Sequence, residues 1–128
     1  MIYLDSSVAL AHILAEDQLP SEALWRERLT SSELIEYEIW NRIYARNLAH
    51  THRDEVVALL ARVALIELAR PVLARALQPF PVPVRTLDGL HLATIEHLRA
   101  GGAAIELASF DRRLIAGARA LGIAIYSL

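Results

Sequence analysis

The sequence predicts an α/β protein built on a parallel sheet. Short apolar segments alternate along the chain with stretches that have the period of an amphipathic helix. Strands joined through helices run parallel, and helices cover both faces of such a sheet. The 128 residues have the length of one ordinary domain, and no linker or repeat divides them, so we expect a single domain over residues 1–128.

The first half of the chain begins with a strand that ends at Asp5, where polar residues follow an apolar run. Pro20 and Ser21 then open a short helix, because proline suits a first helical turn. The strands predicted in this half are residues 2–4, 29–32 and 64–68. The predicted helices are residues 8–15, 21–28, 33–49 and 54–63.

Proline and glycine mark the boundaries in the second half. Pro71 fits the first turn of a helix, and the proline-rich segment 79–83 indicates a stiff extended loop. Gly101 and Gly122 each end a helical stretch, as glycine commonly does. The predicted helices are residues 71–77, 88–99 and 111–121. The predicted strands are residues 103–110 and 123–126.

The composition excludes several classes of function. The absence of cysteine removes disulfides, thiolate zinc sites, iron–sulfur clusters and cysteine nucleophiles, and it fits the reducing cytoplasm, where we expect this protein. All 13 basic residues are arginine, so Schiff-base enzymes and phosphate loops that need lysine are disfavoured. We expect no targeting or membrane-spanning segment, since Met1 leads directly into the first strand.

The apolar content is high for a chain of this length. Hydrophobic residues make up 55% of the sequence, and the helix predicted over residues 33–49 has apolar side chains around most of its circumference. We therefore expect surfaces for partners, namely a homodimer interface and a groove for a partner helix. The candidate anchors, each equally suited to the core, are Trp25, Tyr37, Trp40 and Tyr44.

Acidic residues are the candidates for a site. Asp5 and Asp111 each follow a predicted strand, and ligands bind beyond the carboxyl ends of parallel strands. The two meet only if their strands are neighbours. Asp88 opens the helix before the fourth strand, and Glu36 or Glu38 lies among apolar residues of the long helix, where a carboxylate needs a partner. Each aspartate can instead be a helix N-cap, and periodicity does not separate the two glutamates.

Four local strings, taken together, carry a family resemblance. They are Met1-Ile-Tyr-Leu-Asp-Ser-Ser-Val-Ala-Leu-Ala, Ser31-Ser32 leading to Glu38-Ile39, Arg85-Thr-Leu-Asp-Gly-Leu-His-Leu-Ala-Thr, and Ala108-Ser-Phe-Asp-Arg-Arg-Leu. In this order and spacing they resemble PIN-domain ribonucleases, specifically the toxins of VapBC toxin–antitoxin pairs, over essentially the whole chain. The resemblance implies a three-layer α/β/α fold whose parallel sheet has the strand order 3-2-1-4-5. That order makes the strands before Asp5 and Asp111 neighbours.

The resemblance also implies the site residues. The acidic pocket would hold catalytic and metal-binding carboxylates, with Glu38 favoured over Glu36 by its position after Ser32. These carboxylates belong to Asp5, Glu38, Asp88 and Asp111. Ser7 and Ser109 match hydroxyl positions that support the carboxylates or water on the metal. Gly89 stands where relatives commonly have alanine, which we expect to loosen a helical turn by less than about 1 kcal/mol.

Carboxylates that face one cavity repel one another, so such a cluster needs cations. Oxygen ligands without cysteine or a histidine cluster favour Mg²⁺ or Mn²⁺, which would activate water for attack on an RNA phosphodiester. On this interpretation the protein is a hydrolase, an endoribonuclease toxin held in check by a VapB-type antitoxin. The alternatives are a PIN nuclease of RNA processing and a PIN scaffold that binds RNA or protein without cutting.

Arginine clusters are the candidates for contacts with RNA phosphates, because the net charge of −2 does not attract nucleic acid. Arg112 and Arg113 follow Asp111, and Arg85 precedes Asp88, although each can instead be solvated or paired with an acid. We expect a structural role for His91, which either orients Asp88 or simply packs. His50 and His52 are expected to pair with a helix C-terminus.

Overall fold

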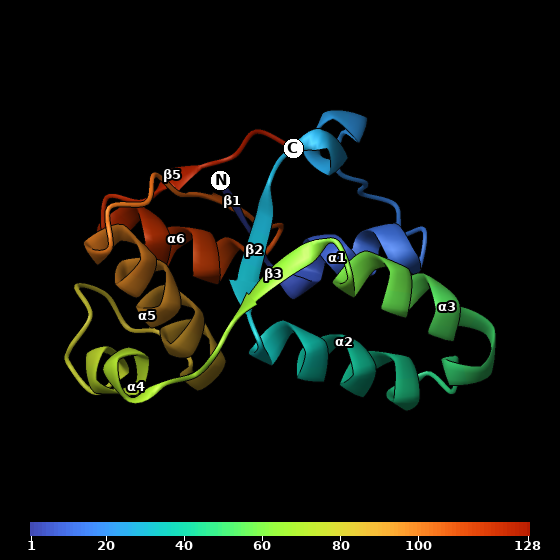
Figure 1. Ribbon diagram of the computed structural model, residues 1–128, viewed down its shortest axis with the longest axis horizontal. Coiled ribbons are helices and arrows are strands. Elements are labelled where there is room, and N and C mark those ends of the chain that lie inside the picture. Colours follow the sequence, from blue (N-terminus) through green and yellow to red (C-terminus); the bar gives the residue numbers. More distant parts are fainter.

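The computed structural model describes residues 1–128 and has a central sheet between two layers of helices (Figure 1). The strands are β1 (Ile2–Leu4), β2 (Leu29–Ser32), β3 (Val63–Ile66), β4 (Glu106–Ala108) and β5 (Ala124–Ile125). The helices are α1 (Ser6–Ile13), α2 (Leu34–Ala45), α3 (Ala49–Leu60), α4 (Arg70–Ala76), α5 (Thr86–Ala100) and α6 (Arg112–Ala120), with a 3₁₀ helix at Glu22–Arg26. None of the helices is long and apolar enough to cross a membrane.

The sheet has the order β3-β2-β1-β4-β5, and all its pairings are parallel. This confirms the predicted fold class and strand order. Leu4 at the end of β1 is in register with Ala108 at the end of β4, and the Asp5 N–H donates to the Ala108 carbonyl at 3.0 Å. The residues that follow β1 and β4 therefore start side by side at one edge of the sheet.

Side chains of the sheet alternate between two hydrophobic cores. On β1, Ile2 and Leu4 belong to a core with α1, α2 and α3, whereas Tyr3 belongs to a core with α5 and α6. The alternation follows because successive side chains of a strand point to opposite faces. In Figure 1, α1, α2 and α3 lie on one side of the strands and α4, α5 and α6 on the other. Each face of the sheet thus has its own core.

The helix predicted over residues 33–49 is wrong in length. α2 ends before Asn47, whose φ of 55° lies in the left-handed region that asparagine tolerates and that ends a helix. α3 then begins at Ala49, several residues earlier than predicted. His50 and His52 consequently lie in the first turn of α3, where they do not pair with a helix C-terminus as expected.

The predicted strands at residues 103–110 and 123–126 are longer than the observed β4 and β5. β1 at the centre of the sheet has only three residues, and β4 pairs with it only over Glu106–Ala108. A short central strand limits the length over which the strands beside it can form hydrogen bonds, because a strand needs a paired strand along its length. Ile105 and Ile123 are nevertheless buried, although they lie just outside β4 and β5.

The predicted aromatic anchors fall into two groups. Tyr37 and Tyr44 on α2 are exposed, with 62% and 59% of their surface accessible. Trp25 and Trp40 are partly buried and pack against the core that includes Ile2 and Leu4. Only the two tyrosines are thus available at the surface of the isolated chain.

Candidate active site

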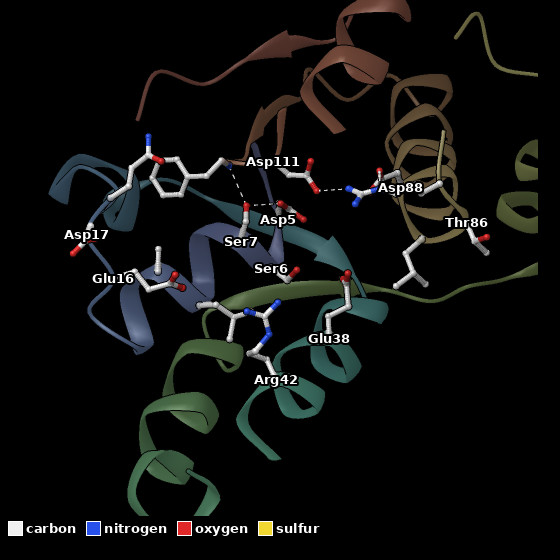
Figure 2. Close-up of a pocket in the computed structure, with 16 residues that line it drawn as sticks. Asp5, Ser6, Ser7, Glu16, Asp17, Glu38, Arg42, Thr86, Asp88 and Asp111 are labelled. Atoms are coloured by element: carbon white, nitrogen blue, oxygen red, sulfur yellow. Dashed lines mark hydrogen bonds and ion pairs between the residues drawn. The ribbon is translucent and has the colours of Figure 1, made fainter. Parts of the chain in front are cut away.

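A pocket of about 780 Å³ lies beyond the carboxyl ends of β1 and β4, and acidic side chains dominate it (Figure 2). The four acids predicted for a site all line it, although they come from four different places in the fold. Asp5 lies between β1 and α1, Glu38 on α2, Asp88 on α5 and Asp111 before α6. Glu36 is exposed and lies outside this lining. The fold therefore brings the four candidates together around one cavity.

Two serines tie the buried Asp5 carboxylate to the segment after β4. The Ser7 hydroxyl donates to Asp5 Oδ2 at 2.5 Å, and the Ser109 hydroxyl donates to the same oxygen at 2.7 Å. Ser7 Oγ accepts from the Phe110 N–H at 3.0 Å, and Ser109 Oγ accepts from the Asp111 N–H at 2.9 Å. Asp5 precedes α1, but its side chain makes no capping hydrogen bond. Its carboxylate is instead held in the pocket.

Burial raises the pKa of the Asp5 carboxyl, and the hydrogen bonds from Ser7 and Ser109 offset part of that rise. Burial also raises the pKa of Asp88, and the neighbouring Arg85 guanidinium opposes it. In both cases the protein removes water from a negative charge. A cation placed among these carboxylates would favour their ionised forms.

The Glu38 carboxylate lines the pocket and contacts His91. The His91 Nε2 and Glu38 Oε1 atoms are 2.6 Å apart, and the Glu38 side chain is 17% exposed. The sequence left open whether His91 orients Asp88, its neighbour on α5, or only packs. The structure shows a different contact, since the imidazole reaches across to α2. Burial lowers the pKa of His91, but the hydrogen bond and charge of Glu38 and the nearby aspartates outweigh it and raise that pKa.

Arg85 bridges the remaining two carboxylates. Its Nε lies 3.0 Å from Asp88 Oδ2, and its Nη2 lies 2.7 Å from Asp111 Oδ2. Asp111 Oδ1 also accepts from the N–H groups of Arg113 and Leu114, so this residue does cap α6. Asp88 does not cap a helix, because α5 begins at Thr86 and Asp88 lies inside its first turn. The capping alternative thus holds for Asp111 alone among the aspartates.

Comparison with known proteins identifies the fold family. Residues 2–120 match the family described as PIN domain, which is nearly the whole chain. The chain belongs to the PIN-domain family. The resemblance to VapC-type PIN domains is confirmed by two relatives from Mycobacterium tuberculosis. Ribonuclease VapC35 is 30% identical over 131 residues, covering 98% of this chain and 95% of that protein. Ribonuclease VapC47 is 26% identical, covering 95% of this chain and 93% of that protein.

The chemistry of the pocket in this PIN domain suits a hard divalent cation. Its charged lining residues are Asp5, Glu16, Asp17, Glu38, Arg42, Arg85, Asp88 and Asp111. Carboxylate and hydroxyl oxygens are the ligands that Mg²⁺ and Mn²⁺ prefer, and the acidic excess attracts cations. No three acidic or histidine side chains are close enough to share one ion in this arrangement, in which Arg85 lies between Asp88 and Asp111. The oxygen donors therefore suit such an ion in kind, and Arg85 competes with it for Asp88 and Asp111.

The arginines of this PIN domain that the sequence suggested for RNA phosphates differ in their surroundings. Arg112 and Arg113 are exposed and lie outside the lining of the pocket, and Arg85 is paired with two acids. Arg42, which the sequence analysis missed, lines the pocket one helical turn after Glu38 and makes no ion pair. The spacing of four residues on α2 is the signal that could have found it, because such residues share a helix face.

Proposed function

We propose that this PIN domain is a Mg²⁺- or Mn²⁺-dependent endoribonuclease toxin of the VapC type that acts in the cytoplasm. The observation that supports it is the meeting of four carboxylates from separate elements in one pocket. The names of the relatives point in the same direction, since both are ribonucleases of the VapC series. A VapB-type antitoxin would neutralise the activity.

The proposed division of labour follows the position of each side chain. Asp5, Glu38 and Asp88 would bind the cation directly or through water, and Asp111 would complete the site. Ser7 and Ser109 hold the Asp5 carboxylate in place through their hydroxyl groups. A divalent cation held there supplies positive charge for the scissile phosphate and lowers the pKa of the attacking water. The acidic lining would otherwise repel an RNA phosphate.

Incubation of antitoxin-free protein with defined transfer and ribosomal RNAs tests the proposal. We expect discrete cuts with Mg²⁺ or Mn²⁺ and none with chelator, and the cut ends should carry 5′-phosphates. Addition of the cognate antitoxin should stop the cutting. Cation binding without cleavage of any RNA would favour a binding scaffold, and cutting that persists in chelator would overturn metal dependence.

The proposal includes a homodimer and a surface for the antitoxin. Tyr37 and Tyr44 support it, because two large aromatic side chains on one helix stay exposed in the isolated chain. The molecular mass of the purified protein at micromolar concentration tests the homodimer, and a stable monomer would count against it.

Replacing Arg85 with glutamine should tighten the binding of divalent cations. The guanidinium pairs with Asp88 and Asp111 and competes with a cation for both carboxylates. We expect Arg85→Gln to lower the dissociation constant for Mn²⁺ about tenfold, which corresponds to about 1.4 kcal/mol. Calorimetric titration measures it, with Arg112→Gln as the control, since Arg112 lies outside the pocket. Unchanged or weaker Mn²⁺ binding by Arg85→Gln would show that the guanidinium does not compete.

Arg42→Ala should weaken RNA binding more than Arg112→Ala. Arg42 lines the pocket and makes no ion pair, so its charge is available to a phosphate, whereas Arg112 is exposed outside the pocket. We expect Arg42→Ala to weaken RNA binding several-fold. The slope of the logarithm of the binding constant against the logarithm of the salt concentration should become shallower by about one. Binding is measured across salt concentrations in chelator, so that RNA is not cut. The reverse ranking would place the RNA along α6.

A further inference from the structure

A buried chain of hydrogen bonds connects the centre of the sheet to the Glu38 carboxylate. Tyr3 on β1 has no accessible surface, and its hydroxyl lies 2.7 Å from His91 Nδ1. His91 is 1% exposed, and its Nε2 lies 2.6 Å from Glu38 Oε1. The Tyr3 and His91 rings meet edge-on, with their centroids 5.8 Å apart. Three side chains from β1, α5 and α2 are thus joined end to end.

One set of hydrogen positions satisfies every contact of this chain. The Ser32 N–H donates to the Tyr3 hydroxyl oxygen at 3.0 Å, and the hydroxyl hydrogen can then be donated to His91 Nδ1. An Nδ1 atom that accepts this hydrogen has none of its own, and a neutral imidazole then has its hydrogen on Nε2. His91 Nε2–H can therefore donate to the Glu38 carboxylate.

The opposite neutral tautomer fits this environment badly. A hydrogen on Nδ1 alone would point the lone pair of Nε2 at the Glu38 carboxylate, 2.6 Å away, where two acceptors repel. A doubly protonated imidazole keeps the Nε2 hydrogen. The donor toward Glu38 is therefore present in both of the forms that the contacts allow.

We propose that His91 and Tyr3 are positioning residues, in which the Tyr3 hydroxyl selects the His91 form that donates from Nε2 and this N–H fixes Glu38 in the pocket. The inference rests on the proposed function, because it assigns Glu38 to cation binding. The arrangement resembles the general case in which a second hydrogen bond orients a ligand and raises its contribution to metal affinity. Here the support comes from Tyr3 on β1, the strand that Asp5 directly follows.

The first arm of the test measures the hydrogen positions on His91 in metal-free protein. Nitrogen-15 NMR of the side chain distinguishes protonated from unprotonated ring nitrogens. We expect a hydrogen on Nε2 in the wild-type protein, and a detectable population with hydrogen on Nδ1 in Tyr3→Phe, which keeps the ring and removes only the hydroxyl. A wild-type His91 with hydrogen on Nδ1 alone, or no change in Tyr3→Phe, would overturn the proposal. This arm needs neither cation nor RNA.

The second arm measures Mn²⁺ affinity by calorimetry. We expect His91→Leu to weaken binding at least tenfold and Tyr3→Phe to weaken it less. His91→Gln should retain more affinity than His91→Leu, because a glutamine amide N–H can take the place of Nε2–H. In a Glu38→Gln background, His91→Leu should cost no further affinity. If His91→Leu weakens Mn²⁺ binding as much in the Glu38→Gln background as in the wild type, His91 acts only on packing. If every His91 variant binds Mn²⁺ with wild-type affinity, His91 does not position Glu38.

The two arms keep the inference separate from the proposed function. A wild-type protein that binds no Mn²⁺ and cuts no RNA overturns the proposed function, whereas the NMR result still decides which atom of His91 donates to Glu38. If His91→Leu does not fold, Tyr3→Phe and His91→Gln carry the affinity measurement. A protein that binds Mn²⁺ and cuts RNA with unchanged affinity in Tyr3→Phe overturns the inference alone.

Discussion

Asp5→Asn should reduce RNA cleavage about 100-fold or more and abolish the rise of the melting temperature with Mg²⁺ or Mn²⁺. Asparagine keeps an oxygen that can accept from Ser7 and Ser109 but loses the charge that a cation needs. A bound cation contributes several kcal/mol to charge stabilisation, and each 1.4 kcal/mol corresponds to about a factor of ten in rate. Cleavage assays and melting curves with and without metal measure the two effects.

The same variant should be at least as stable as the wild type when metal is absent. Burial raises the pKa of Asp5, so the folded protein holds this proton more tightly than the unfolded chain does. Ionisation of Asp5 as the pH rises to neutral therefore costs folding free energy, and asparagine avoids that cost. Asp54→Asn, at an exposed position on α3 outside the pocket, is the control. Metal-dependent stabilisation that survives in Asp5→Asn would remove Asp5 from the cation site.

Ile39→Ala should destabilise the fold by about 2–5 kcal/mol, a large share of the roughly 5–15 kcal/mol expected for a domain. Ile39 has no accessible surface and packs in the core beneath α1, α2 and α3. Truncation there removes buried apolar contacts and leaves a cavity. The midpoint of urea unfolding, with the slope of the transition, measures the loss.

Tyr37→Ala on the same helix is the matched control for Ile39→Ala. Tyr37 is largely exposed in the isolated chain, so its truncation should change stability by less than about 0.5 kcal/mol. A loss that grows with protein concentration would instead indicate that a second copy covers Tyr37. Equal losses from both variants at low concentration would contradict the packing of α2 described above.

The fold was predictable because its strongest signals are local and are arranged in a known order. Short apolar strands alternate with helices, and the resemblance to PIN domains supplied the strand order that makes β1 and β4 neighbours. Periodicity alone did not distinguish Glu36 from Glu38, since both lie on one apolar helix. The resemblance favoured Glu38, and the fold places Glu38 alone of the two in the pocket.

The remaining features depend on contacts between distant segments. The break at Asn47 interrupts an apolar pattern that continues across it, so the pattern predicted one long helix. His91 reaches Glu38 across 53 positions in the sequence, whereas helical spacing draws attention only to Asp88. The bridge from Arg85 to Asp111 likewise joins residues 26 positions apart. Such pairings become visible only when the elements are packed together.

Because the two cores are separate, cation binding in the pocket can show whether the two helical layers open independently or together. Glu38 is carried by a helix of one core, and Asp88 by a helix of the other. If the layer that contains α2 opens alone, Glu38 leaves the pocket while Asp88 stays. If the layer that contains α5 opens alone, Asp88 leaves and Glu38 stays. Amide hydrogen exchange on α2 and α5, followed as Mn²⁺ is added, would then slow on both helices together, because a ligand that binds only the closed form protects every element it requires.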